Sequence, residues 1–290
     1  MRLNMNKKIS LIGTSRGERP QEIKRLLDSL TDTAHVELIF VDQSKDDSVS
    51  EIFVEYDGII SYKLIKSHPC SLSKARNTAL SYANGSIIGF CDDDAHYSKV
   101  TIEYLTNQSF ERTILSIPVK DFASNKNYAN RKFPIKRKNM SYLGIIRYSL
   151  SVGTFIFLEK NTRPNSIYFD ERLGAGTPLG GSEETDLFFR LKSENYTTIF
   201  DPTVHVYHDN DQPSREDLTL AKKYELYAIG YAVVLKSHLI QSKFLLSIEI
   251  IRVIVRCTLG LLLPEKRLIC LHRLLGFFKG LFTVSLGSSR

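Results

Sequence analysis

The stretch SIIGFCDDD, residues 86–94, joins an apolar segment to three consecutive aspartates. The segment Ser86–Cys91 has the length and composition of a buried strand. Strands of an open parallel sheet carry their functional residues at their carboxyl ends, where loops line the ligand crevice. The position of the triplet Asp92, Asp93 and Asp94 therefore predicts a ligand site at the end of this strand.

Strand and helix patterns alternate on the N-terminal side of this stretch. Three further short apolar strands are predicted, at Ile9–Gly13, Val36–Val41 and Ile59–Ile65. Apolar residues with helical spacing lie between the strands, at Pro20–Leu30, Ser48–Tyr56 and Leu72–Ala83. Alternating strands and helices with short connections indicate an α/β fold, in which helices cover a parallel sheet.

The second half of the chain begins with a polar excursion. Residues 120–139 are polar and basic and predict a long mobile loop. The elements expected beyond it are strands Ser151–Leu158 and Ile199–Tyr207, helix Glu183–Lys192 after a loop at Gly174–Gly181, and a last helix from near Ser214. The sequence thus predicts an α/β domain over residues 1–212 and a C-terminal helical region over residues 213–290.

The composition is that of an ordinary folded protein. The 290 residues are 42% hydrophobic and 24% charged, which excludes disordered and collagen-like chains. The cysteines form no CxxC pair, which argues against a zinc knuckle or a disulfide framework and favours a reducing compartment. The apolar run Ile9–Ile12 is too short for the core of a signal peptide. We therefore expect a cytoplasmic protein.

The net charge of +7 belongs to the C-terminal quarter of the chain. Residues 215–290 hold 12 Lys and Arg against 5 Asp and Glu, whereas the first 214 residues hold equal numbers of both kinds. This cationic quarter is also the most apolar part of the chain. The combination favours an anionic membrane surface over nucleic acid as a partner.

The C-terminal region has the pattern of two amphipathic helices separated by Pro264. Phe244–Leu263 is long enough to span a bilayer, but it carries Glu249, Arg252 and Arg256 on one helical stripe. Lys266–Phe282 likewise has its charges on one side and leucine and phenylalanine on the other. We predict an anchor that lies in the membrane plane, with a dimer interface or a lid on the catalytic core as alternatives.

The aspartate triplet requires a cation if it is partly buried, because its carboxylates repel one another. Oxygen ligands favour Mg²⁺ or Mn²⁺, which also bind diphosphate oxygens; a solvated acidic turn is the alternative. Two further polar groups follow predicted strands: Thr14, Ser15 and Arg16 after the first, and Asp42 at the end of the second. A nucleotide site is therefore expected. The absence of GxGxxG and GxxxxGK[ST] argues against a dinucleotide-binding dehydrogenase and a phosphate-loop NTPase.

Four ordered motifs carry a resemblance to a known family. They are LSKARN at Leu72–Asn77, FCDDD at Phe90–Asp94, GSEETDL at Gly181–Leu187 and HVYH at His205–His208. Together they resemble family 2 glycosyltransferases, over roughly residues 8–240. The resemblance implies the GT-A fold, a Rossmann-like, mixed and mainly parallel sheet flanked by helices, here with a C-terminal helical, membrane-associating extension.

The resemblance also implies a metal and nucleotide site. Asp94 would be the main metal ligand, with Asp92 near the ribose and able to reach the metal, Asp93 beside the nucleotide, and His208 near the metal and the diphosphate. Asp42 would contact the base. Thr14, Ser15 and Arg16 would line the base and ribose, and Arg76 would approach the diphosphate. Without the resemblance, Arg76 is equally compatible with a solvated helix face, and His208 with a strand-end histidine.

The acidic pair Glu183 and Glu184 is the candidate catalytic base. It matches the family's Glu-Asp pair with Glu in the second place, so that either carboxylate is a candidate. Transfer of a sugar needs a carboxylate within hydrogen-bond reach of the acceptor hydroxyl. The alternative is favourable negative charge at a helix N-terminus, the role expected of Asp186.

The resulting hypothesis is an inverting glycosyltransferase that adds a single sugar in bacterial surface-polysaccharide synthesis. The donor would be a nucleoside diphosphate sugar, with a UDP-sugar favoured over dTDP- and GDP-sugars, and the acceptor a carbohydrate or lipid-linked glycan. The enzyme would be cytoplasmic and peripheral on the inner face of the membrane, with no nucleic-acid partner. The alternatives are a nucleotidyltransferase and a non-catalytic scaffold that binds sugar nucleotides.

Overall fold

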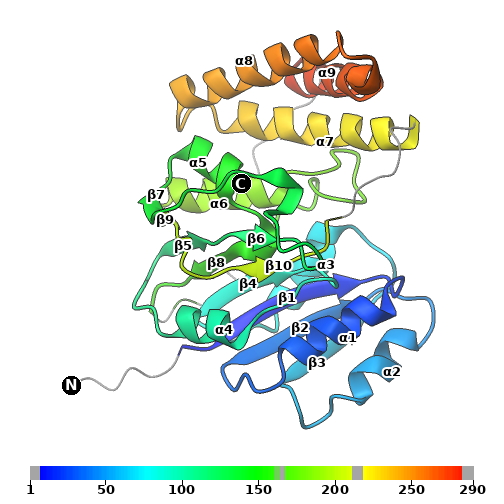
Figure 1. Cartoon of the computed structure of the whole chain (residues 1–290), viewed down its shortest axis with the longest axis vertical. Helices are drawn as coiled ribbons and strands as arrows, with labels where there is room; N and C mark the ends of the chain where they lie inside the picture. Colours follow the sequence, from blue (N-terminus) through cyan, green and yellow to red (C-terminus); the bar gives the residue numbers. More distant parts are fainter. Residues whose placement is uncertain (1–6, 161, 163–166, 211–217, 283–290) are drawn as a thin grey trace. The chain divides into compact units, whose positions relative to one another are not determined.

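The chain forms two compact units in the computed structural model, which describes residues 7–160, 162, 167–210 and 218–282 (Figure 1). The first unit comprises Met1–Cys70, Lys74–Tyr168 and Glu194–Asn210. The second comprises Ser71–Ser73, Phe169–Ser193 and Asp211–Arg290. The predicted domain boundary at residues 212–213, and the predicted start of the last helix near Ser214, lie outside the described residues.

An eight-stranded sheet with the order β3-β2-β1-β4-β8-β5-β9-β7 forms the centre of the first unit. Its strands are β1 (Ile9–Ser15), β2 (Val36–Asp42), β3 (Tyr62–Lys66), β4 (Ile87–Cys91), β5 (Thr113–Ser116), β7 (Lys138–Asn139), β8 (Thr154–Phe157) and β9 (Thr197–Phe200). The first four strands in this order, β3, β2, β1 and β4, are parallel to one another. β8 is antiparallel to its two neighbours, β4 and β5. β9 is parallel to β5, and β7 is antiparallel to β9. The predicted mixed, mainly parallel sheet is confirmed.

Helices cover the sheet and explain why its central strands are apolar along their whole length. The first unit contains α1 (Pro20–Ser29), α2 (Ser48–Val54), most of α3 (Leu72–Leu80), α4 (Lys99–Thr106) and α5 (Tyr142–Tyr148). Leu26 of α1, Phe53 of α2 and Leu105 of α4 belong to one buried cluster with alternate residues of β1, β2 and β4. Burial on both faces is typical of parallel strands.

Gly13 shows how closely the central strands pack. A Cβ atom at this position would lie 2.7 Å from Cys91 Sγ and 2.8 Å from the Phe40 ring. No larger residue fits without displacing these neighbours. The glycine therefore sets the packing between β1 and the two strands on either side of it.

The excursion at residues 120–139 is more ordered than predicted. It begins in β6 (Val119–Lys120), contains a 3₁₀ turn at Tyr128–Asn130, and ends in β7. Asp121 accepts a hydrogen bond from the Ser124 amide at 2.8 Å and another from the Asn210 amide at 2.9 Å. The prediction of a long mobile loop is wrong for these parts of the segment, because hydrogen bonds distant in sequence hold them.

The predicted strand Ile199–Tyr207 is two strands, β9 and β10 (Val206–Tyr207). Asp201 causes the break, because its carboxylate accepts hydrogen bonds from the Thr203 amide at 3.0 Å and the Thr203 hydroxyl at 2.6 Å. Such a turn competes with sheet pairing. β10 then pairs with β6 in a separate two-stranded sheet.

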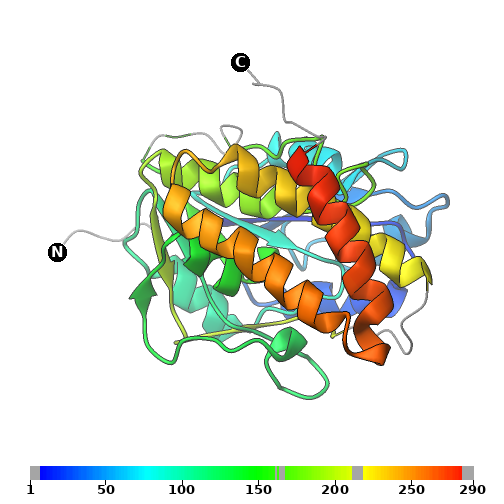
Figure 2. The ribbon, with the colours of Figure 1, turned by 90° about the horizontal axis from the view of Figure 1, so that it is seen from above.

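The second unit contains a described loop at residues 169–182 and the helices α6 (Glu183–Ser193), α7 (Leu218–Ser237), α8 (Lys243–Gly260) and α9 (Arg267–Phe282). Two glycines allow α9 to approach α7 closely. A Cβ at Gly276 would lie 2.2 Å from the Glu225 carbonyl oxygen, and a Cβ at Gly280 2.4 Å from that of Ile229. α8 and α9 diverge from a 3₁₀ turn at Pro264–Lys266, in the predicted position (Figure 2).

The charges predicted to share one stripe of α8 have different environments. Glu249 is fully buried and accepts hydrogen bonds from the Tyr231 hydroxyl at 2.8 Å and from Arg252 Nε at 2.7 Å. Arg256 is exposed. The exposed residues of α8 include an apolar row at Ile248, Ile251, Val255 and Leu259. Among the described helices, none is both long and apolar enough to cross a membrane.

Candidate active site

The end of β4 places the aspartate triplet at the edge of the sheet. β4 is buried along its whole length, and Asp92 follows directly after Cys91. The side chain of Asp94 is fully buried and that of Asp93 is 9% exposed, whereas the Asp92 side chain is 34% exposed. The triplet is therefore not a solvated acidic turn.

His208 reaches the triplet through the small β6–β10 sheet. The backbones of His96 and Tyr207 exchange two hydrogen bonds of 3.0 Å, which attach the segment after the triplet to β10. The His208 amide also donates to the Lys120 carbonyl at 2.9 Å. These bonds hold a histidine that is more than a hundred residues distant in sequence beside the carboxylates.

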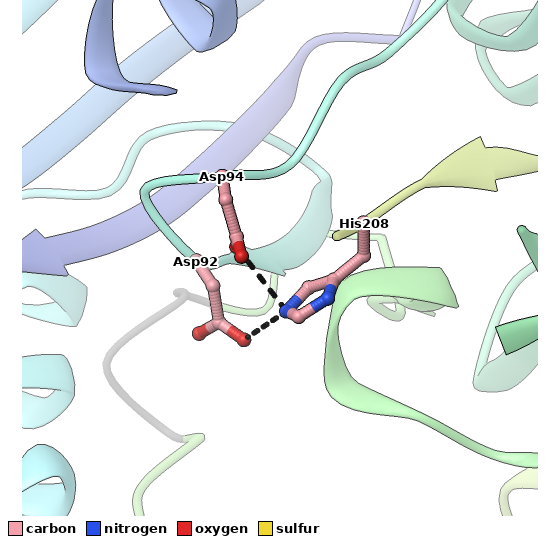
Figure 3. Close-up of side chains that lie close together, drawn as sticks. All are labelled: Asp92, Asp94 and His208. Atoms are coloured by element: carbon pink, nitrogen blue, oxygen red, sulfur yellow. Dashed lines mark hydrogen bonds and ion pairs between the residues drawn. The ribbon is translucent and has the colours of Figure 1, made fainter. Parts of the chain in front are cut away.

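Asp92, Asp94 and His208 form a cluster with the chemistry of a metal site (Figure 3). His208 Nε2 lies 3.2 Å from Asp92 Oδ2 and 3.2 Å from Asp94 Oδ1. One ligand atom from each of the three residues lies within 4.8 Å of the other two. Asp94 Oδ1 is buried and has no hydrogen-bond partner in the described part of the chain.

The electrostatics of the cluster favour a cation. Burial opposes the charge on His208, but Asp92 and Asp94 outweigh it and raise the pKa of His208 to about 9. Burial raises the pKa of Asp94, which lies beside two other carboxylates. A protonated imidazole thus stands between carboxylates that otherwise repel each other. The two carboxylates fit a divalent cation such as Mn²⁺ or Mg²⁺, because these ions prefer oxygen ligands. His208 would join them as a ligand only after its Nε2 has lost its proton to make room for the cation.

Two arginines hold the triplet in place. Arg19 donates to Asp94 Oδ2 at 2.7 Å and forms a second ion pair with Asp93. Arg76, whose side chain is 1% exposed, donates to Asp92 Oδ1 at 3.2 Å. The predicted contact of Arg76 with a diphosphate stays a prediction. Arg19 was missed by sequence reasoning, although it stands next to Pro20 in the loop after the first strand.

The predicted nucleotide residues lie at the ends of β1 and β2. Ser15 donates to Asp93 Oδ2 at 2.5 Å, and Thr14 accepts from Gln43 Nε2 at 2.8 Å. Asp42 is buried and accepts from the Ser44 amide at 2.8 Å and from Lys66 Nζ at 3.0 Å. Gln43 and Lys66 were not predicted.

Arg16 is the exception among these residues. It is exposed, and it has no hydrogen bond or ion pair within the described ranges. Its side chain is thus available to a ligand. The structure therefore brings Ser15 and the triplet together, while the contacts of Arg16 stay a prediction.

The acidic pair begins α6 in the second unit. Glu183 is buried, and its carboxyl carbon lies 3.3 Å from the position that a Cβ at Gly174 would occupy. Glu184 is partly exposed. Asp186 lies in the first turn of α6, where a negative charge was expected, and it is also bonded to Arg190 Nε at 2.8 Å and to His238 Nε2 at 2.9 Å. Glu184 is thus the more accessible carboxylate of the pair.

Comparison with protein families identifies the chain. Residues 10–162 match the model of glycosyl transferase family 2. The chain belongs to this family. The matched range contains β1 except for Ile9, every strand from β2 to β8, and the aspartate triplet. A comparison with curated protein sequences gave no match.

Solved structures show the same GT-A fold as this family 2 chain. S. aureus TarS 1–349 has a TM-score of 0.54 and 20% identity over 79% of this chain and 65% of that one. Its complex with UDP-GlcNAc has a TM-score of 0.53 and 19% identity, over 80% and 71% of the two chains. The mannosyltransferase PcManGT from Pyrobaculum calidifontis, solved with GDP-Man and Mn²⁺, has a TM-score of 0.57 and 13% identity over 96% and 88%. The chain thus spans just under two thirds of the first TarS structure.

Proposed function

We propose that this protein is an inverting glycosyltransferase that moves one sugar from a nucleoside diphosphate sugar to a carbohydrate or lipid-linked acceptor. The observation that carries the proposal is the buried cluster of Asp92, Asp94 and His208 at the end of β4. Membership in glycosyl transferase family 2 supports it. A cluster of this kind accounts for donor binding, and the family accounts for the reaction class.

The chain's own residues prepare the donor site. Asp92, Asp94 and His208 would hold the divalent cation, and Arg76 and Arg19 fix the carboxylates. When bound, the cation supplies positive charge that offsets the charge developing on the departing diphosphate. Ser15 and Arg19 hold Asp93, so that the triplet does not reorganise when the donor binds.

We assign Glu184 as the base because it is partly exposed, whereas Glu183 is buried. The Glu184 carboxylate accepts the proton of an acceptor hydroxyl as the hydroxyl oxygen bonds to the anomeric carbon. The bond between that carbon and the diphosphate oxygen breaks, and its electron pair leaves with the nucleoside diphosphate. Direct displacement at one carbon inverts its configuration.

A UDP-sugar is the proposed donor, with GDP- and dTDP-sugars as the alternatives. The solved complexes of TarS with UDP-GlcNAc and UDP, and of PcManGT with GDP-Man and Mn²⁺, support a nucleotide sugar. The proposed setting is surface-polysaccharide synthesis at the cytoplasmic face of a bacterial membrane. The exposed apolar row on α8 and the excess of cations after residue 214 support an anionic membrane surface as a partner.

A thermal-shift panel of nucleoside diphosphates and their sugars, with and without Mn²⁺, tests the donor site. A ligand at 100 times its Kd stabilises by about 2.7 kcal/mol, or roughly 5–10 °C in Tm for a chain of this size. We expect this shift for one nucleotide family and only with the metal. If no nucleotide raises Tm, the proposed donor site is wrong.

The products separate the proposed reaction from its alternatives. Incubation with the bound donor and an extract of glycan or lipid-linked acceptors should release nucleoside diphosphate. Free pyrophosphate in its place would identify a nucleotidyltransferase. Donor binding without release of any product, across the whole acceptor panel, would identify a non-catalytic binding protein.

A further inference from the structure

A cavity of about 580 Å³ lies in the second unit, among α7, α8 and α9. Most of its lining residues come from the C-terminal half of α8 and the N-terminal half of α9, on either side of the connecting turn. Its volume falls within the range of roughly 300–1,000 Å³ that is common for small-molecule sites. The resemblance to family 2 glycosyltransferases assigned no residue of this cavity a role.

The polar lining of the cavity is cationic. Arg252, Arg256, Lys266 and Arg273 contribute to it, and none of its lining residues is acidic. Arg252 is paired with the buried carboxylate of Glu249. The other three have no carboxylate partner in the described part of the chain, and the Arg273 guanidinium lies 5.4 Å from the centre of the Tyr224 ring.

The remaining lining is largely apolar and continues onto the exposed surface. Val255, Leu259 and Leu263 line the cavity and are 50%, 59% and 43% exposed. Leu262, which is 74% exposed, extends the apolar surface beyond the cavity. A ligand that fits this lining has an anionic group for the three cations and an apolar part for the leucines.

We propose that this cavity binds the phosphate group of a membrane lipid, with the lipid chain against Val255, Leu259 and Leu263. The proposal deepens the membrane part of the proposed function and rests on it. A nucleic acid does not match the apolar walls, and free phosphate leaves them in contact with water. Arginine and lysine bind phosphate through charge-assisted hydrogen bonds, which are the strongest available here.

Vesicle cosedimentation of the full chain tests the proposal. The variant is Arg256→Gln/Lys266→Gln, in which both side chains are exposed and carry no other contact in the described ranges. The matched control is Lys222→Gln/Lys243→Gln, which removes the same charge from exposed positions of the same unit outside the cavity. The vesicles are phosphatidylcholine alone and phosphatidylcholine mixed with phosphatidic acid.

We expect the cavity variant to bind phosphatidic acid vesicles at least roughly tenfold more weakly than the unaltered protein. The variant removes two of the three cations of the cavity that have no carboxylate partner among the described residues, so direct phosphate contact is lost together with part of the general attraction to the anionic surface. The control should lose clearly less, because its lysines do not line the cavity. Equal loss in the two variants would show that bulk charge alone attracts the protein, and would overturn the cavity site.

Two further comparisons complete the test. One distinguishes a lipid phosphate from free phosphate, and the other distinguishes failure of the cavity proposal from failure of the proposed membrane binding. Inorganic phosphate should not displace the protein from the vesicles more than chloride at equal ionic strength; if it does, the ligand is phosphate and not a lipid. If the unaltered protein binds neither vesicle, the membrane part of the proposed function fails too. If it binds both and the cavity variant binds equally well, only the cavity proposal fails. The Mn²⁺-dependent donor shift should be unchanged in the variant.

Discussion

Asp94→Asn should abolish most of the metal-dependent donor binding without unfolding the protein. Asp94 is fully buried, and its Oδ1 lies 3.2 Å from His208 Nε2, without a hydrogen bond of its own among the described residues. Asparagine keeps the size of the side chain and an oxygen for Arg19. It removes a negative charge from the cluster and places an amide group, which ligates metals poorly, where a carboxylate oxygen stood.

The size of the expected loss in metal affinity follows from the small number of ligand residues in the cluster. Loss of a group that only supports a ligand costs 10–100-fold in metal affinity, and Asp94 is one of three ligand candidates. We therefore expect a loss of at least about 100-fold, or roughly 2.7 kcal/mol. Because burial raises the pKa of Asp94, the metal-free variant should be at least as stable as the metal-free parent.

Asp93→Asn is the matched control, since Asp93 lies outside the cluster. It should change Mn²⁺ affinity no more than about threefold, and because burial raises the pKa of Asp93 as it does that of Asp94, this variant too should be at least as stable as the metal-free parent in EDTA. Calorimetric titration with Mn²⁺ and donor measures the affinity, and thermal unfolding in EDTA measures the stability. Unchanged Mn²⁺ affinity in Asp94→Asn, or an equal loss in Asp93→Asn, would refute the assignment of the cluster.

Three further predictions concern catalysis, packing and pH. Glu184→Gln should keep donor affinity and lower turnover by at least about 100-fold; if Glu183→Gln shows this loss instead, Glu183 is the base. Gly276→Leu should lower Tm by several degrees, because its Cβ would lie 2.2 Å from the Glu225 carbonyl oxygen and overpacking costs about 1–3 kcal/mol; an unchanged Tm would contradict the α7–α9 contact. Burial opposes the charge of Glu37, but hydrogen bonds from Lys8, Ser10 and the Asn84 amide outweigh it and lower its pKa from 4.5. Its carboxylate therefore stabilises the fold fully above about pH 4.5 and loses this effect as pH falls through the lowered pKa, so the Tm difference between the parent and Glu37→Gln should narrow below pH 4; a constant difference would argue against a charged Glu37.

The sequence predicted most of the parallel half of the sheet because β1, β2 and β4 are buried on both faces, whereas β3 at the edge is only partly buried. The order of β1, α1, β2 and α2 follows from runs of apolar residues and a proline at the first turn of α1. The division of β9 from β10 was not predictable in this way. It depends on the Asp201 side chain, which forms a turn inside an apolar run. The close packing at the two glycines of α9 could not be predicted either, because it depends on the backbone of the neighbouring helix α7.

The candidate site shows the same limit. The aspartate triplet was found because its three residues adjoin one strand. Arg19 donates to a carboxylate 75 positions away in the chain. His208, 116 positions from Asp92, was identified only through resemblance to a family. Patterns of neighbouring residues thus predict the aspartate triplet. The positions of Arg19 and His208 beside it depend instead on how distant segments of the chain pack together.

The exposed apolar row of α8 leads to a prediction about membrane binding that leaves the fold intact. Ile251 and Val255 are 60% and 50% exposed, so Ile251→Glu/Val255→Glu removes little internal packing. Inserting these two side chains into a lipid interface would contribute about 1–2 kcal/mol each, since complete burial of such a side chain is worth about 1.5–3 kcal/mol. Glutamate adds a desolvation cost and repulsion from anionic lipid. The double variant should therefore partition at least about 30-fold more weakly into anionic vesicles.

Thermal unfolding distinguishes this surface effect from loss of the fold. Leu246 lies on the same helix but is completely buried, so Leu246→Glu should lower Tm by many degrees, whereas the double variant should retain the parent's Tm. Deletion of residues 243–290 would be less informative, because it removes Phe277 and the carboxylate that pairs with Tyr231 from the buried part of the second unit. A double variant with normal Tm and undiminished vesicle binding would exclude α8 as the membrane contact. The exposed apolar row of α8 would then need another partner, such as a second copy of this chain. A change in the oligomeric state of the double variant on gel filtration would identify that partner.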